Sequence, residues 1–174
     1  MARTSLSLLV GSLAFISAST AWAQRTLVDS RDQAEGWYLP VHGEVSVEGK
    51  PVEEYKVILY KNNESLGEVP IGKKGQFELE LDIDQLDTVR VVKEGFQEKI
   101  MNIDTTLPEG LTKYPAYDCF INLQATNAQG VDPFYTDFPS AIVRYDAEMK
   151  GFYHSEHYLT HIQTRLAGIA SATF

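Results

Sequence analysis

The stretch Val41-His42-Gly43-Glu44-Val45-Ser46-Val47-Glu48 alternates apolar or small residues with polar ones along its whole length. A period of two is typical of a β-strand that buries one face and exposes the other to solvent. Gly49-Lys50-Pro51 ends the pattern, because proline fixes φ and glycine tolerates turn geometry. A second half-buried strand is predicted at residues 76–81, with Phe77, Leu79 and Leu81 inside and Glu78 and Glu80 outside.

Outward from these strands, short segments of the same kind recur at the roughly eight- to twelve-residue spacing of antiparallel sheets, separated by glycine-containing turns. Residues 55–61 are apolar on both faces and predict a central strand. Further strands are predicted at residues 66–71, 88–93, 96–103, 117–126 and 140–146. No helical period appears before residue 150, which excludes a doubly wound fold. The predicted fold class is therefore all-β, an antiparallel β-sandwich.

The charge and the cysteine count of the chain exclude several classes of binding partner and site. The chain has 174 residues, of which 24 are acidic and 15 basic, for a formal net charge of -9. An acidic chain lacks the charge that nucleic acid or an anionic membrane requires. The single cysteine, Cys119, excludes an intrachain disulfide and a cysteine-based zinc site. It lies on the apolar face of a predicted strand, so we expect a buried side chain rather than a reactive thiol.

The first 23 residues have the features of a secretory signal peptide. A short basic start with Arg3 precedes a mostly apolar run at residues 6–16, and Ala21-Trp22-Ala23 supplies a small-x-small cleavage signal. The apolar run is too short to span a bilayer, so no transmembrane segment is expected in the mature chain. We therefore expect a protein secreted to the periplasm or cell surface, with residues 24–38 as a flexible lead-in.

Five short motifs carry a resemblance to a known family. They are Gly43-x-Val45, Gly49-Lys50-Pro51-Val52, Val57-x-Leu59-Tyr60-Lys61-Asn62, Gly75-Gln76-Phe77-x-Leu79 and Val92-Lys93-Glu94-Gly95-Phe96. In this order and spacing, the segment resembles a carboxypeptidase regulatory-like domain, the transthyretin-like β-sandwich of secreted bacterial proteins. The resemblance implies a sandwich at residues 39–104. It also implies a C-terminal extension at residues 105–174 with two or more strands, an aromatic loop and a short helix, packed on the sandwich.

The resemblance also implies a non-catalytic domain, and the motifs present in the sequence agree with it. No His-x-x-Glu or His-Glu-x-x-His zinc motif, Gly-x-Ser-x-Gly elbow or glycine-rich phosphate loop occurs in the chain. We therefore expect no enzyme activity and no cofactor. The expected function is a binding or structural module with a protein partner in a cell-envelope or surface assembly. The alternatives are carbohydrate binding and metal binding by histidines.

The candidate metal ligands are His154, His157 and His161, whose spacings of three and four residues would align them on one helix. A helix is predicted from Ser155 to Leu166, and the histidines border its apolar face. That helix would have Ser155 as its N-cap and would dock through Tyr158, Leu159, Ile162 and Leu166. A helix that begins at Ser155 turns His154 away from the other two histidines. Packing without a metal is therefore the expected role of this segment.

The candidate binding surface consists of aromatic side chains in and after a predicted loop. An exposed aromatic ring can stack on a sugar or anchor a partner protein. The alternative is that these rings close an open end of the core. The residues are Phe134, Tyr135, Phe138, Phe152 and Tyr153.

We expect the exported chain to begin at Gln24 and to carry no lipid, because no cysteine follows the cleavage signal at the new N-terminus. The intact mass of protein purified from its native source measures both properties. A mass that includes residues 1–23, or an acyl adduct, would contradict this expectation.

Overall fold

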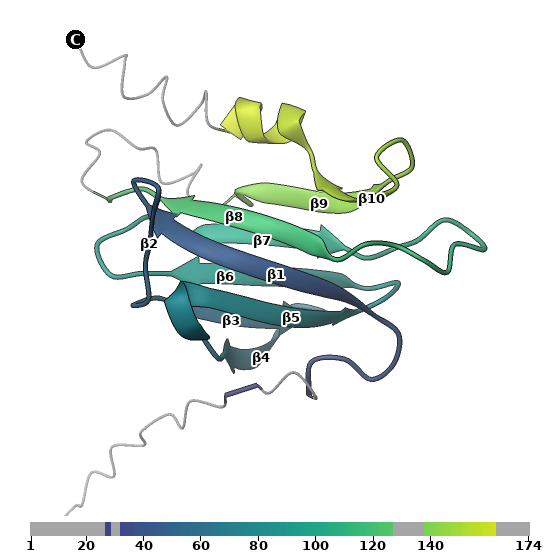
Figure 1. Ribbon diagram of the computed structural model, residues 1–174, viewed down its shortest axis with the longest axis horizontal. Helices are drawn as coiled ribbons and strands as arrows, with labels where there is room; N and C mark the ends of the chain where they lie inside the picture. The colour runs from purple at the N-terminus through teal and green to yellow at the C-terminus, as the bar shows by residue number, and fades with distance from the viewer. Residues whose placement is uncertain (1–26, 29–31, 127–137, 163–174) are drawn as a thin grey trace, which may run out of the picture.

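The computed structural model describes residues 27–28, 32–126 and 138–162, which form two β-sheets facing each other (Figure 1). The smaller sheet contains β1 (Tyr38–Val47), β2 (Lys50–Pro51), β5 (Gln76–Asp82) and β8 (Tyr117–Leu123). The larger sheet has the order β10-β9-β7-β6-β3-β4. Its strands are β3 (Lys56–Lys61), β4 (Glu64–Val69), β6 (Leu86–Val92), β7 (Lys99–Asp104), β9 (Ala141–Asp146) and β10 (Gly151–His154).

The predicted all-β sandwich is confirmed, and its strands occupy the segments that alternate in sequence. Strand β3 is central, as expected, because it pairs with both β4 and β6. Two details differ from the expectation. Strand β10 was not predicted, and two of the pairings, β1 with β8 and β7 with β9, are parallel. Both parallel pairings join segments far apart in the chain, so no short turn in the sequence indicates them.

Strand β1 lies between two neighbours, and its register sets which residues share a face. It pairs antiparallel with β5, so that His42 lies opposite Glu78, and parallel with β8, so that His42 also lies opposite Asp118. Strand β8, which belongs to the expected extension, is therefore a full member of the sandwich. Because side chains alternate along a strand, all three of these residues face away from the core.

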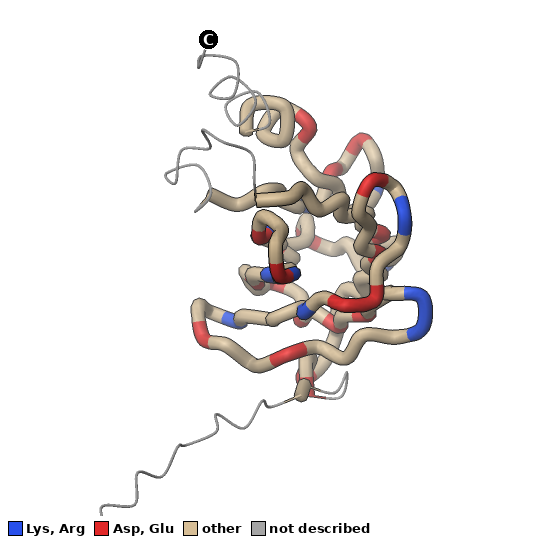
Figure 2. The backbone as a smooth tube through the Cα atoms, turned by 90° about the vertical axis from the view of Figure 1, so that its left-hand side faces the viewer, with Lys and Arg blue, Asp and Glu red and all other residues tan. Residues whose placement is uncertain are grey.

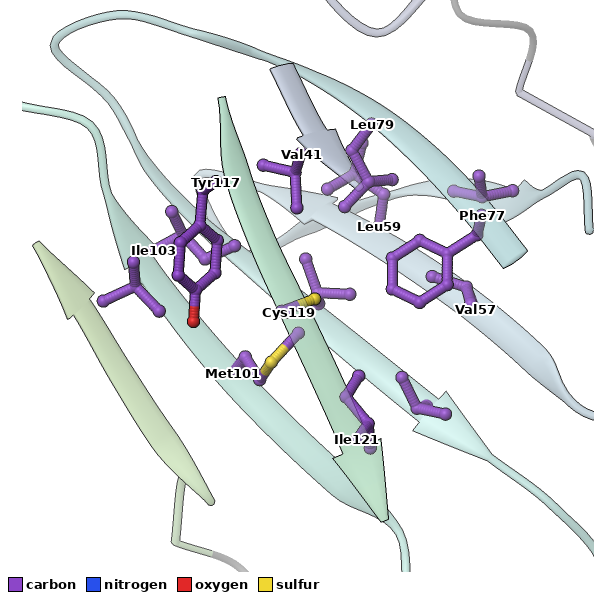
Figure 3. Packing of buried hydrophobic residues seen from close by; sticks show 14 of the residues in the cluster. Val41, Val57, Leu59, Phe77, Leu79, Met101, Ile103, Tyr117, Cys119 and Ile121 are labelled. Atoms are coloured by element: carbon purple, nitrogen blue, oxygen red, sulfur yellow. The ribbon is translucent and has the colours of Figure 1, made fainter. Parts of the chain in front are cut away.

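The core is filled by alternate residues of both sheets (Figure 3). Phe77 is 1% exposed, and its ring lies directly over Gly43 of the neighbouring strand. A Cβ atom on Gly43 would lie 2.0 Å from the Cζ atom of that ring, so the glycine makes room for the aromatic side chain. Cys119 is buried in the same core, as predicted. Burial, reinforced by the charge of Asp118, raises the pKa of its thiol to about 12.

The lead-in, which was expected to be flexible, makes specific contacts at its described residues. The backbone N–H of Val28 donates to the carbonyl of Glu68 on the edge strand β4, at 3.0 Å. The buried Gln33 side chain accepts a hydrogen bond from the backbone N–H of Glu80 on β5, at 3.0 Å. The lead-in therefore satisfies backbone groups at the outer edges of β4 and β5, which would otherwise be open to pairing with another chain.

A short helix at residues 156–162 follows β10, and Ser155 is its N-cap as predicted. The Ser155 Oγ atom accepts a hydrogen bond from the backbone N–H of Tyr158 at 3.3 Å. The Tyr158 hydroxyl donates to the carbonyl of Pro139 at 2.7 Å, and Ile162 is buried. Leu166 lies outside the described residues. Within the described part of the chain, no helix is long and apolar enough to span a lipid bilayer.

Two aspartates at one end of the sandwich have opposite electrostatic environments. Burial alone would raise the pKa of Asp82, but hydrogen bonds and an ion pair from Lys61, together with the backbone N–H groups of Glu35 and Gly36, hold it below its ordinary value. Asp87 is 1% exposed, and its Oδ2 atom has no hydrogen-bond partner among the described residues. Burial raises its pKa to about 6, although the charge of Lys61 opposes the shift.

We expect Gly43→Ala to destabilise the fold by roughly 1–3 kcal/mol, because the added methyl group overpacks the ring of Phe77. Phe77→Ala alone should cost about 3–5 kcal/mol through lost burial and a cavity. The double variant should be less destabilised than the sum of the two, because the cavity accepts the methyl group. Denaturant melts measure all three, with Glu78→Ala as a control expected to stay within about 0.5 kcal/mol. Additive effects would show that Gly43 and Phe77 are not in contact.

The raised pKa of Asp87 predicts a loss of stability with rising pH. Well below pH 4 its carboxyl group is neutral in the folded and the unfolded chain, and between pH 4 and pH 7 ionisation of the unfolded chain costs the native state roughly 2–3 kcal/mol. The free energy of unfolding of Asp87→Asn, relative to the native chain, should rise by that amount between pH 4 and pH 7. The exposed Asp32→Asn serves as the control. A difference that does not change with pH would contradict the assignment.

Candidate functional site

The outward face of the smaller sheet gathers polar side chains from β1, β5 and β8. We call it the open face and define it by His42, Glu44, Gln76, Glu78, Asp118 and Phe120, which all line a shallow concavity of about 420 Å³. Each of these residues alternates with a core residue of its own strand. The same period of two that buries Val41, Phe77 and Cys119 therefore builds the site.

The central contact of the open face is a hydrogen bond between His42 and Asp118. The His42 Nδ1 atom lies 2.9 Å from Asp118 Oδ1, and the two side chains are 55% and 67% exposed. The parallel register of β1 and β8 produces the contact, because it places the two residues side by side. A carboxylate on Nδ1 fixes the tautomer and leaves Nε2 as the nitrogen available to accept a proton.

A second row of side chains lies one step along the strands. Gln76 Nε2 donates to Glu44 Oε2 at 3.5 Å, and Phe120, which neighbours Glu44 on the other side, is 81% exposed. The described residues that line the concavity include three carboxylates and no lysine or arginine. Acidic positions also recur around the rest of the sandwich (Figure 2). The open face therefore favours a neutral or cationic ligand over an anionic one.

The residues in and beside the open face differ in the chemistry that they permit. Cys119 touches the concavity but is buried and has a raised pKa, so its thiol stays protonated and is a poor nucleophile. Ser46, the next outward residue of β1, donates its hydroxyl to the carbonyl of Ile121 at 3.5 Å. Among the residues that the structure describes, no group of three or more metal-ligating side chains is placed to hold a metal ion. Proton transfer by His42 is the chemistry that this arrangement permits.

The C-terminal histidines predicted as candidate ligands are distributed over two elements. His154 belongs to β10, where its Nδ1 atom lies 3.5 Å from the Tyr117 hydroxyl and its ring stacks on Tyr153 at 4.9 Å between centroids. His157 and His161 are exposed on the helix that follows. The strand-to-helix change after His154 separates it from the other two.

The predicted aromatic surface is likewise divided. Phe134 and Tyr135 lie outside the described residues. Phe138 and Tyr153 are 39% and 37% exposed, whereas Phe152 is buried. The Phe152 ring packs edge-on against the rings of Tyr114 and Tyr145, with centroids 5.8 and 5.7 Å away. Phe152 is therefore part of the core and does not present its ring to a ligand.

The sequence pattern does not mark the open face as a site. It predicts that His42 and Glu78 face outward, but a lone outward histidine beside carboxylates is the ordinary pattern of a solvated strand. The missing information was the pairing of β1 with β8, which brings together residues 76 positions apart in the chain. No local pattern reports a parallel pairing of that separation.

No family model matches this chain, and no curated protein matches it. Among solved structures, it is similar to a 3-chlorocatechol 1,2-dioxygenase from Rhodococcus opacus, at 14% identity, over 56% of this chain and 62% of that one, with a TM-score of 0.38. A catechol 1,2-dioxygenase from Pseudomonas arvilla is 9% identical over 63% of this chain and 57% of its own, with a TM-score of 0.39. The chain thus spans less than two thirds of both enzymes.

A third similar structure is the dioxygenase domain of a dioxygenase–carbohydrate-binding fusion from a cellulolytic Streptomyces species. It is 14% identical over 75% of this chain and 82% of its own, with a TM-score of 0.37. These likenesses are of fold, and they transfer no substrate, metal or mechanism to this chain.

The comparison contradicts the function predicted from the sequence. The similar structures are catalytic domains, contrary to the expectation of a non-catalytic binding or structural module with its glycan and metal alternatives. The expectation that the chain is not an enzyme is contrary to the same finding. The error has a physical cause. The absence of short catalytic motifs excludes sites built within one segment, but a sandwich can assemble a site from separate strands.

Proposed function

We propose that the open face is the active site of an acid–base enzyme in which His42 transfers the proton. The observation that carries this proposal is the 2.9 Å contact between His42 Nδ1 and Asp118 Oδ1. Asp118 holds the imidazole in the tautomer with hydrogen on Nδ1, so that Nε2 is the atom that takes the proton. Asp118 is thus a positioning residue, and His42 is the group that acts on substrate or water.

The reaction class is proton abstraction, either from the substrate directly or from a water that then attacks it. A covalent route through Cys119 is disfavoured, because its pKa of about 12 leaves almost no thiolate at neutral pH. The carboxylates Glu44 and Glu78 beside His42 repel anionic substrates such as phosphate esters. Neutral or cationic esters, amides and related carbonyl compounds are therefore the substrate classes that fit.

We further propose that this site belongs to an exported protein of the transthyretin-like, carboxypeptidase regulatory-like type. The signal-like first 23 residues and the five motifs of the resemblance support this proposal. The lead-in contacts at Val28 and Gln33 are compatible with cleavage after Ala23, because both residues remain in the mature chain.

The experiment is turnover of a panel of neutral and cationic chromogenic esters and anilides by the full chain. His42→Gln should lower kcat/KM by about 10²–10⁴-fold, as expected for removal of a general base. Asp118→Asn should cause a smaller loss and change the pH profile, because the imidazole is still present but no longer oriented. His157→Gln, at an exposed histidine outside the open face, is the matched control and should leave turnover unchanged.

A second measurement tests the geometry without a substrate. Nitrogen-15 NMR of the neutral imidazole should show His42 with its hydrogen on Nδ1, and Asp118→Ala should remove that preference. Equal turnover by the native chain and His42→Gln, or no turnover of any compound in the panel, would contradict the proposed function.

A further inference from the structure

Besides the contacts of Val28 and Gln33, the lead-in is held to the sandwich by one carboxylate, that of Asp82. The backbone N–H groups of Glu35 and Gly36 donate to Asp82 Oδ1 at 2.9 and 3.2 Å. The other oxygen of that carboxylate, Oδ2, is paired with the Lys61 ammonium. Lys61 and Asp82 are 21% and 16% exposed, so the pair is largely shielded from water. One side chain thus joins the lead-in to β3 and β5.

A second carboxylate competes for the same lysine. Asp87 of β6 lies directly opposite Lys61 of β3, and its buried Oδ2 atom has no hydrogen-bond partner among the described residues. The charged groups that act on Asp87 are Lys61 from β3 and Asp82 from β5. Strand β7 places the apolar Ile103 opposite it, and the lead-in contributes backbone N–H groups to Asp82. Lys61 is the cation among the charged groups that act on Asp87, so an ionised Asp87 competes with Asp82 for its ammonium group.

We propose that Asp87, Lys61 and Asp82 form a pH-sensitive latch that holds the lead-in on the sandwich when Asp87 is neutral and loosens it when Asp87 is ionised. When Asp87 is neutral, the ammonium group of Lys61 pairs with Asp82 alone. The Asp82 carboxylate is then held in position to accept hydrogen bonds from the backbone N–H groups of Glu35 and Gly36. An ionised Asp87 attracts the ammonium group and repels Asp82, so both supports of the carboxylate weaken. Because Asp87 has a pKa of about 6, the change falls in the range of ordinary external pH.

Loosening of the latch has a structural consequence further along the lead-in. Gln33 covers the backbone edge of β5, and it lies only two residues before the latched segment. Release at Glu35 and Gly36 therefore weakens the cover on β5. The inference is independent of the proposed chemistry at His42, because the latch residues do not line the open face.

The test is amide hydrogen exchange of the full chain at pH 5 and pH 8, corrected for the intrinsic exchange rates. Protection of the Glu35 and Gly36 amides should fall by about tenfold or more at the higher pH. The Val89 amide in β6 serves as an internal reference, because its exchange reports global opening of the fold. Asp87→Asn should keep both amides protected at both values of pH. The exposed Asp32→Asn is the control and should behave like the native chain.

Asp82→Ala removes the acceptor, and the two amides should then be unprotected at both values of pH. Protection that is equal at pH 5 and pH 8 in the native chain would overturn the latch, as would a pH dependence that survives in Asp87→Asn. A stable, protected lead-in in Asp82→Ala would show that another contact holds it and would likewise overturn the proposal.

Discussion

Strand β1 is paired along both edges, and this constraint fixes the faces of three strands together. A shift of one residue against β5 or β8 would exchange buried and exposed side chains, and a shift against β5 would also move Gly43 from beneath the ring of Phe77. Because only a residue without a Cβ fits there, the contact between Gly43 and Phe77 selects one register. The open face is a consequence of that selection, since His42 and Glu44 flank the glycine.

The parts of the fold that depend on local pattern could be predicted from the sequence. Polar and apolar residues alternate along β1 and β5, and β3 is apolar on both faces, so each strand is visible within a few residues of sequence. Ser155 precedes its helix and is an ordinary N-cap residue. The parallel pairing of β1 with β8 could not be predicted, because it depends on how the whole chain returns to its first strand. The contact between His42 and Asp118 depends on that pairing. The candidate site was therefore less predictable than the fold that carries it.

The histidines of the C-terminal segment show that a local sequence pattern can also suggest a cluster that the fold does not form. Spacings of three and four residues align side chains only within one continuous helix. His154 ends β10, so its ring is placed by the sheet, beside Tyr117 and Tyr153, whereas His157 and His161 are placed by the helix. A spacing in the sequence suggested a cluster that the boundary between two elements divides. At the open face, the pairing of two strands that are far apart in the sequence does the reverse and brings residues together.

Asp118 links the two chemistries that the open face could support, and it favours one of them. Its carboxylate accepts the hydrogen bond that orients His42, which promotes proton transfer by the imidazole. The same negative charge adds to the effect of burial in raising the pKa of its sequence neighbour Cys119, which suppresses the thiolate. Alternation along β8 is the reason that one residue does both, because Asp118 faces solvent while Cys119 faces the core. A sandwich strand with this pattern therefore supports a general base on its surface and keeps the adjacent nucleophile inactive beneath it.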